Sequence, residues 1–226
     1  MLNWILKKMV AIIAIILLPT LMLAQDSNLG NWLIYIGNKK VNDRWNIHHE
    51  VQYRNFNAIG DLEQLLLRTG VGYNLTPGNN NFLLGYGFIN SQNFIGPDEK
   101  VGVNEHRIFQ QFITKQKIAK FRVQHRYRFE QRFIEDTDFK LRFRYFLAVN
   151  YPLPIVMKEG SNRELYLSAY NEIFLNSEGN IFDRNRLYGG LGYRLNKIVR
   201  FELGYMNQFF SGADRDQINI IGFVSF

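Results

Sequence analysis

The sequence predicts an all-β protein: an antiparallel transmembrane β-barrel of about ten to twelve strands that follows an N-terminal signal peptide. Apolar and polar residues alternate with period two over most of the 226-residue chain. The alternating segments are about as long as the 9–11 residues that a tilted strand needs to cross a bilayer. The chain also begins with two lysines and an apolar run, which is typical of an exported protein.

The first 24 residues have the order of a secretory signal peptide. The lysines precede an apolar run from Met9 to Leu23, and the small residue Ala24 precedes a polar stretch. The run is shorter than the roughly 20 residues of a membrane-spanning helix, and Pro19 interrupts it. We expect cleavage after residue 24 and a single barrel domain over residues 25–226, located in the outer membrane of a Gram-negative cell.

The composition narrows the function classes. Aromatic residues make up 15% of the chain, which suits strands and the aromatic belts of membrane proteins. The absence of cysteine excludes disulfides, thiolate metal sites and a cysteine nucleophile. The formal net charge is +7, but there is no basic tail and no nucleic-acid motif. We therefore expect no nucleic-acid partner and assign the basic residues to one face of the strands.

The alternation is clearest in two neighbouring segments. In 121–133, Phe121, Val123 and Tyr127 alternate with arginines, and 139–151 repeats the pattern after a polar turn. The first segment carries Trp32, Ile34 and Ile36 on one face. Eleven strand candidates result: 31–37, 45–54, 65–75, 82–88, 104–116, 121–133, 139–151, 165–175, 187–195, 199–209 and 218–226.

Eleven candidates conflict with the even strand number of bacterial barrels. Either the first strand lies outside the barrel, or a strand is hidden in the long link 152–163. Short connections at 76–80, 115–120 and 196–198 fall on alternate turns, which predicts a periplasmic end. The outer connections are then 56–62, 91–103, 134–138, 176–185 and 211–216.

The chain ends on an amphipathic strand. Ile218, Ile220, Gly222, Val224 and the C-terminal Phe226 share one face. Outer-membrane barrels end on such a strand with a terminal aromatic, which the barrel-assembly machinery reads. This machinery and the lipid of the outer membrane are therefore the expected partners.

Several strings in the chain resemble a bacterial family. They are Asn104-Glu105-His106-Arg107, His125-Arg126-Tyr127-Arg128-Phe129-Glu130-Gln131-Arg132-Phe133, Asn171-Glu172-Ile173-Phe174 and Asp183-Arg184-Asn185-Arg186-Leu187-Tyr188. The family is catalogued as domain of unknown function 2490, and the resemblance covers the chain from about Trp32 to its end. It implies an outer-membrane-type β-barrel with no established activity, and it supplies no catalytic or binding residue.

The charged faces of the strands are expected to point into the barrel. A Lys or Arg on the lipid side of a barrel costs about 2–4 kcal/mol at the bilayer midplane. Two interpretations of this lumen follow: a structural ion-pair network that fills a narrow interior, or a narrow channel that favours anionic solutes. The candidate lumen residues are Glu50, Arg54, Arg68, Arg107, Arg122, Arg126, Arg128, Glu130, Arg132, Arg142, Arg144, Glu172, Arg200 and Glu202.

No catalytic constellation is visible, so we expect neither an enzyme nor a cofactor. An outer-membrane lipid-modifying enzyme is one alternative, with His125 on the apolar face and Ser168 in a strand. A soluble periplasmic ligand-binding barrel is the other, and its two faces would be reversed. No metal site is expected, because the adjacent His48 and His49 of a strand point to opposite faces.

Overall fold

The structure of the protein is a computed structural model. It describes residues 29–58, 60–76, 78–97, 99–154 and 162–226. The predicted signal peptide, residues 1–24, lies outside the described residues, and so does most of the link 152–163. The described residues contain no helix long and apolar enough to cross a membrane.

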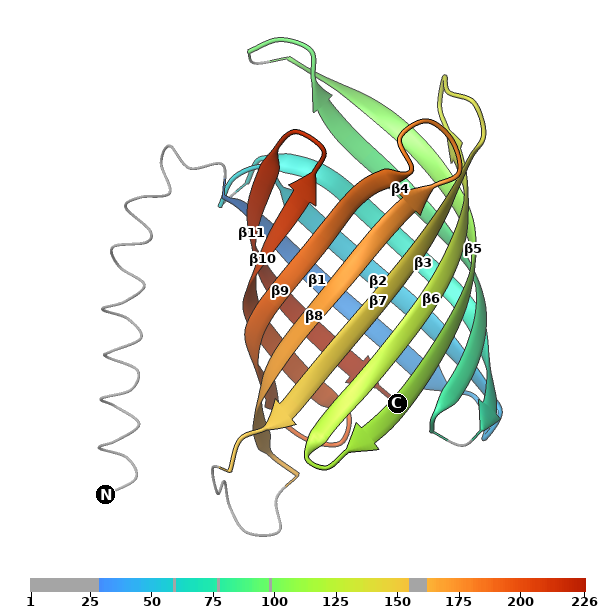
Figure 1. Ribbon diagram of the computed structural model, residues 1–226, viewed down its shortest axis with the longest axis vertical. Helices are drawn as coiled ribbons and strands as arrows, with labels where there is room; N and C mark the ends of the chain where they lie inside the picture. The colour runs from blue at the N-terminus through green and yellow to red at the C-terminus, as the bar shows by residue number, and fades with distance from the viewer. Residues whose placement is uncertain (1–28, 59, 77, 98, 155–161) are drawn as a thin grey trace, which may run out of the picture.

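Eleven strands form one closed barrel, which confirms the predicted all-β fold (Figure 1). Each strand pairs with the next along the chain in antiparallel register. The strands are β1 (Gly30–Lys40), β2 (Trp45–Asn55), β3 (Leu62–Thr76), β4 (Asn80–Phe94), β5 (Lys100–Ile118), β6 (Phe121–Ile134), β7 (Lys140–Pro152), β8 (Glu164–Asn176), β9 (Phe182–Arg194), β10 (Val199–Phe210) and β11 (Asp214–Ser225).

The barrel closes through a parallel pair. β1 runs alongside β11 from the pair Gly30 and Gln217 to the pair Asn38 and Ser225. Both ways of restoring an even strand number were therefore wrong: β1 lies inside the barrel wall, and no twelfth strand is present in the described part of the chain. Strands joined by tight turns alternate in direction, so the first and eleventh point the same way and can close only as a parallel ladder.

Because the barrel closes with an odd number of strands, its first and last strands begin and end at opposite rims. Gly30 begins β1 at the rim that carries the β10–β11 connection, whereas Phe226 lies at the other rim (Figure 1). There the Phe226 amide donates to the carbonyl of Asn38, and the Lys40 amide donates to the carbonyl of Phe226, at 3.1 and 2.7 Å. The C-terminal aromatic thus completes the β1–β11 seam.

The connections divide as predicted between the two rims. The β3–β4, β5–β6 and β9–β10 turns lie at the same rim as the C-terminus, which we call the turn end (Figure 1). The opposite rim, which we call the loop end, carries the β4–β5 hairpin that extends beyond the wall, and the loop between β8 and β9. β5 is 19 residues long because it forms part of that extension.

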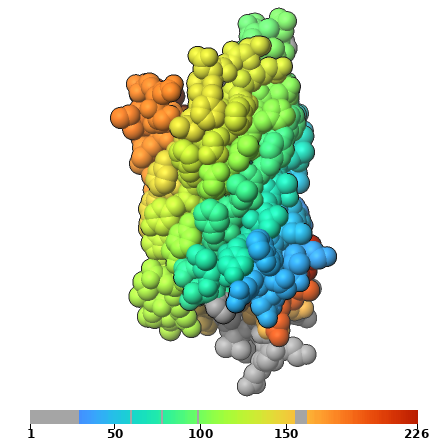
Figure 2. All heavy atoms as spheres, turned by 90° about the vertical axis from the view of Figure 1, so that its right-hand side faces the viewer, coloured from blue at the N-terminus to red at the C-terminus, as the bar shows by residue number. Residues whose placement is uncertain are grey.

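The faces of the wall differ in polarity. In β6, Phe129 is 40% exposed, whereas Arg128 and Glu130 beside it are 2% and 0% exposed. Large apolar side chains such as Leu84 and Leu203 are likewise exposed on the outer face. Figure 2 shows one side of this outer surface. The apolar residues therefore point out of the barrel and most charged residues point in.

β1 departs from this pattern. Leu33 and Tyr35 are its exposed side chains, while Trp32, Ile34 and Ile36 pack inside the barrel. They contact an apolar cluster made by Tyr188, Met206, Ile221 and their neighbours Tyr170 and Phe223. One side of the interior is therefore apolar, which the charge pattern of the other strands does not predict.

Inward aromatic rings lie over glycines of the neighbouring strand. A Cβ atom added to Gly192 would come within 2.1 Å of Cζ of Tyr166, and one added to Gly85 within 2.3 Å of Cζ of Phe109. Only glycine permits so close an approach of ring to backbone. The rings fill the interior space that the glycines, which have no side chain, leave empty.

We predict that cysteines placed at Leu33 and Ile220 form a disulfide under mild oxidation. The two residues are register partners across the β1–β11 seam and both are exposed on the outer face. Adjacent strands lie about 4.7–4.9 Å apart, within the range of Cα separations that a disulfide accepts. Because the chain has no native cysteine, a mobility change on a non-reducing gel reports this bond alone.

The control pair is Leu33→Cys with Leu203→Cys. Leu203 is the register partner of Ile220 on β10, so it lies one strand further from β1. We expect no bridge in this pair. Equal bridging of both pairs, or bridging of neither, would contradict a barrel closed by β1 and β11.

Candidate functional site in the barrel interior

The residues predicted to line the lumen all lie in the inward register of their strands. Ten of them are buried and four are half-buried. The buried ones are Glu50, Arg54, Arg68, Arg107, Arg128, Glu130, Arg142, Arg144, Glu172 and Glu202, and the half-buried ones are Arg122, Arg126, Arg132 and Arg200.

Glu130 of β6 is the centre of this interior. Its carboxylate accepts hydrogen bonds from Arg142 at 2.6 Å and from Arg144 at 2.7 Å. Arg128 and Arg107 lie within 3.6 and 4.0 Å. One fully buried carboxylate therefore lies within 4 Å of four guanidinium groups drawn from β5, β6 and β7.

Glu172 of β8 extends the network. It accepts hydrogen bonds from Arg144 at 2.6 Å and Arg126 at 2.7 Å, and Arg186 lies at 3.9 Å. Arg144 therefore bridges Glu130 and Glu172. Three consecutive strands, β6 to β8, are tied together inside the barrel by one guanidinium group.

Two further carboxylates hold the rim of the network towards the loop end. Glu105 accepts hydrogen bonds from Arg107 at 2.6 Å and from Arg132 at 2.5 Å. Asp183 pairs with Arg142 at 3.2 Å. Glu105 binds both of its arginines in the two-bond geometry that guanidinium favours, whereas Arg142 makes a single bond to Asp183.

The network closes the middle of the barrel. Phe109 and Glu130 have no exposed surface, and Arg128 is 2% exposed. The guanidinium carbon of Arg128 lies 4.6 Å from the centroid of the Phe109 ring. A water-filled passage would leave such side chains accessible, so none runs past these three residues.

The interior towards the turn end has a different character. Glu202 accepts hydrogen bonds from Tyr166 at 2.9 Å, Ser168 at 3.1 Å and Arg200 at 2.9 Å. Arg122 pairs with Glu164 at 2.6 Å near the turn-end rim. The two arginines named here each have a carboxylate within 3 Å, and Arg200 also lies over Phe223 of the apolar cluster.

Towards the loop end the interior opens into a chamber of about 150 Å³. Nine arginines line it but only two glutamates, so its wall carries a marked excess of positive charge. The charged lining consists of Arg54, Arg68, Arg107, Arg132, Arg142, Arg144, Arg184, Arg186, Arg215, Glu63 and Glu105.

Several lining residues escaped the sequence prediction of the site, among them Trp32, Glu63, Arg184 and Arg215. Arg184 and Arg215 stand near strand ends, where alternation is hard to assign, and Glu63 precedes the first regular apolar residue of its segment. Trp32 lies on the apolar face of β1, and on the other strands the apolar face points outward. In β1 this face points into the barrel. The sequence pattern gave no sign that the apolar face of β1 points inward.

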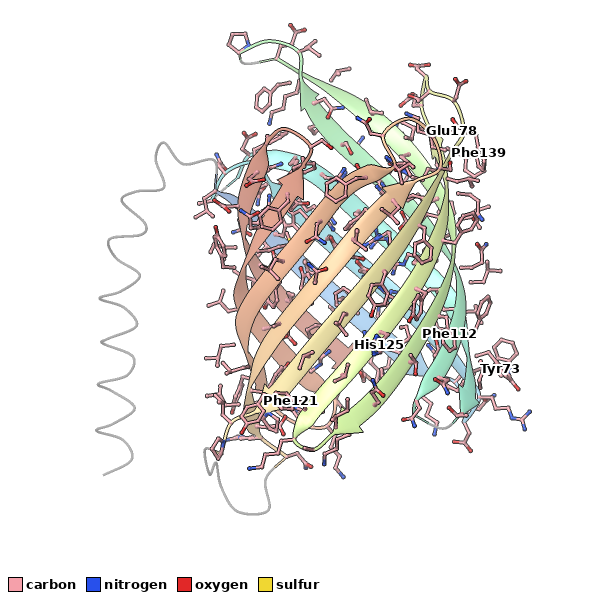
Figure 3. The ribbon with its side chains drawn as sticks, in the orientation of Figure 1. Tyr73, Phe112, Phe121, His125, Phe139 and Glu178 are labelled. Carbon is pink, nitrogen blue, oxygen red and sulfur yellow. The ribbon has the colours of Figure 1, made fainter. Side chains whose placement is uncertain are left out.

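The two residues considered for catalysis lie on opposite faces of the wall. His125 is on the outer face of β6, where its Nδ1 is 2.8 Å from the Tyr145 hydroxyl (Figure 3). Ser168 is inside and donates to Glu202. They cannot act together as base and nucleophile. Among the residues that the structure describes, no three His, Asp or Glu side chains are grouped to hold a metal ion.

We predict that Glu130→Gln lowers the free energy of unfolding by about 3–5 kcal/mol, because it leaves buried guanidinium groups without their charge partner. Urea titration of the barrel in detergent, followed by its folded gel mobility, measures the change. Glu164→Gln is the matched control at a half-exposed pair, with an expected loss below about 1 kcal/mol. Equal losses in both variants would mean that the central network does not stabilise the barrel.

The closed barrel and its charged interior can be compared with known proteins. Comparisons with curated proteins and with solved structures returned no match. A family model described as protein of unknown function (DUF2490) matches residues 29–219, from the start of β1 to the middle of β11. The match spans most of the barrel and agrees with the resemblance of its charged strand sequences. The chain therefore belongs to the family of proteins of unknown function DUF2490.

Proposed function

We propose that the protein is an integral β-barrel of the outer membrane of a Gram-negative cell, and that it is a structural protein or a narrow channel rather than an enzyme. Its ion-paired interior holds the barrel closed at the middle and favours anions at its loop end. The observation that carries the proposal is the inverted polarity of the wall, with apolar side chains outside and ion pairs inside.

The outer face supports a lipid environment. Exposed side chains include Leu67, Val71, Leu84 and Leu203, each more than 40% accessible and each in the middle part of its strand. Soluble monomers rarely expose apolar patches larger than a few hundred Å². A soluble ligand-binding barrel would need the reverse arrangement, with apolar residues inside around its ligand.

Strand length and aromatic positions agree with a membrane. Every strand has at least the 11 residues of β1, against about 9–11 needed to cross a bilayer. Outer aromatic residues stand towards both rims: Phe121 and Tyr73 towards the turn end, and Phe139 towards the loop end (Figure 3). Aromatic rings in these positions suit the two membrane–water interfaces.

The interior supports a closed or narrow passage rather than a wide pore. Glu130 and Phe109 are completely buried, and the network around Glu130 crosses between strands at this level. Wide porins instead have a water-filled lumen. Any solute that enters from the loop end meets a wall in which arginines outnumber acids, which favours anions.

We predict that the protein in isolated outer membranes resists carbonate extraction and runs at different apparent masses before and after boiling in SDS. A folded membrane barrel resists the detergent until heat breaks its closed ladder. Release into the soluble fraction with no heat-dependent shift would contradict membrane insertion and favour the soluble ligand-binding barrel.

Conductance recordings in planar bilayers test the proposal that the interior is closed or narrow. Because the middle of the barrel is filled, we expect at most small conductance steps that carry anions better than cations. A large, steady conductance without ion preference would contradict the closed interior while leaving membrane insertion intact.

A further inference from the structure

We propose that the loop-end chamber is a binding site for a phosphate-type oxyanion, held chiefly by Arg54 and Arg186 beside Trp32. The proposal deepens the proposed function, since it names the anion class that the interior would receive. It stands on four observations: excess charge, an arginine without an acidic partner, an indole shared by two guanidinium groups, and buried donors without acceptors.

The excess charge remains when neighbouring carboxylates are included. Glu50, Glu130, Glu172 and Asp183 form ion pairs with arginines of the chamber wall although they do not line it. With Glu63 and Glu105, six carboxylates then face nine arginines. A small anion in the chamber would supply the compensation that the protein itself does not.

Arg54 is the arginine that most needs an anion. It is 7% exposed, and the structure gives it no ion pair with any carboxylate of the described residues. Its hydrogen bonds go to neutral amide oxygens, to Gln52 at 2.9 Å and Gln64 at 2.6 Å. Burial of a charge without a counter-charge costs free energy. An anion that binds at Arg54 removes this cost, which favours binding.

Trp32 brings a second guanidinium group to the same place. The guanidinium carbon of Arg54 lies 3.7 Å from the centroid of the Trp32 ring, and that of Arg186 lies 4.8 Å from it. The indole face attracts both cations and fixes their planes. Arg186 has one distant carboxylate, Glu172 at 3.9 Å, and otherwise donates to Gln208 at 2.7 Å.

Two buried donors in the chamber wall have no acceptor among the described residues. They are Nε1 of Trp32 and Nε of Arg68, in side chains that are 3% and 7% exposed as residues. Buried N–H groups are rarely left without a partner. Both N–H groups have almost no accessible surface, so an oxyanion in the chamber would accept from them after a small rotation of the Trp32 or Arg68 side chain.

The size and donor chemistry select the class of ligand. A cavity needs about 10–15 Å³ to hold one water molecule, so about 150 Å³ admits an anion of several atoms. Arginine forks match the oxygens of phosphate and carboxylate in bidentate geometry. Phosphate fits better than a single carboxylate because it offers oxygens to donors on several sides at once.

The test uses the intrinsic fluorescence of Trp32. The sequence has three tryptophans, so Trp4→Phe and Trp45→Phe in the full chain leave Trp32 as the only one. We expect inorganic phosphate to change its emission with saturation in non-ionic detergent, and sodium chloride at equal ionic strength to leave it unchanged. Arg54→Gln in this background should weaken phosphate binding about tenfold or more, as expected for lost hydrogen bonds to a charged group.

Two further variants make the test specific. Arg122→Gln changes an interior arginine that pairs with Glu164 near the turn end and does not line the chamber, so phosphate affinity should stay unchanged. Glu63→Gln removes one of the two chamber carboxylates and should strengthen binding, which keeps the proposal testable if Arg54→Gln misfolds.

Three results would overturn the proposal. They are no saturable change in a barrel whose gel mobility is still heat-dependent, an equal change with sodium chloride, and equal weakening by Arg54→Gln and Arg122→Gln. Each can occur in a protein that inserts into membranes, so failure of the site is distinguishable from failure of the proposed function.

A second titration distinguishes two sources of the phosphate group, which are lipid headgroups and free solutes. Anionic phospholipid added to the micelles should reproduce the change in Trp32 emission only if lipid headgroups reach the chamber. If the ligand is a free solute, the lipid has no effect and inorganic phosphate still binds. Either result supports the oxyanion site and assigns its ligand.

Discussion

Compensation of buried charge inside a narrow closed barrel is the constraint on which the rest of the structure depends. Because the outer face is apolar, the charges of the strands must point inward, where little water is available to solvate them. Glu130 and Glu172 meet this constraint by sharing arginines from neighbouring strands, and Arg144 joins the two. The same pairing closes the middle of the barrel. The positive charge that the acids do not balance gathers in the loop-end chamber.

Closure by an odd number of strands shapes that chamber. β1 enters the wall parallel to β11, and its register turns Trp32 inward beside Arg54 and Arg186. The apolar residues that follow, Ile34 and Ile36, pack on the cluster around Met206. One strand thus supplies both the aromatic wall of the chamber and the apolar side of the interior. It also places the start of the barrel at the loop end and Phe226 at the turn end.

The sequence allowed prediction of the strands and of most of their faces, because period-two alternation with unlike faces is strong in segments such as β6 and β7. The cost of charge in lipid then assigned Arg128 and Glu130 to the interior. Alternation carries no information on ring closure, so it could not show that β1 pairs with β11, and the usual even number of strands was misleading. It also could not match Arg142 of β7 with Asp183 of β9, which lies two strands away, or leave Arg54 without an acid. Such pairings depend on the tilt and register of strands that are remote in the chain. Arg184 and Arg215 were missed because alternation is hard to assign near strand ends, and Trp32 because the inward face of β1 is apolar.

Quenching of single tryptophans by brominated lipid tests the central claim, that this wall faces lipid with its apolar side and encloses its charges. One variant retains only Trp32, which is 3% exposed inside the barrel, and the other has Phe129→Trp, on the outer face of β6, as its only tryptophan. In vesicles of brominated lipid, the tryptophan at 129 should be strongly quenched and Trp32 should be nearly unaffected. Quenching of Trp32 to the same degree, or no quenching at 129, would contradict the inverted polarity on which the account rests.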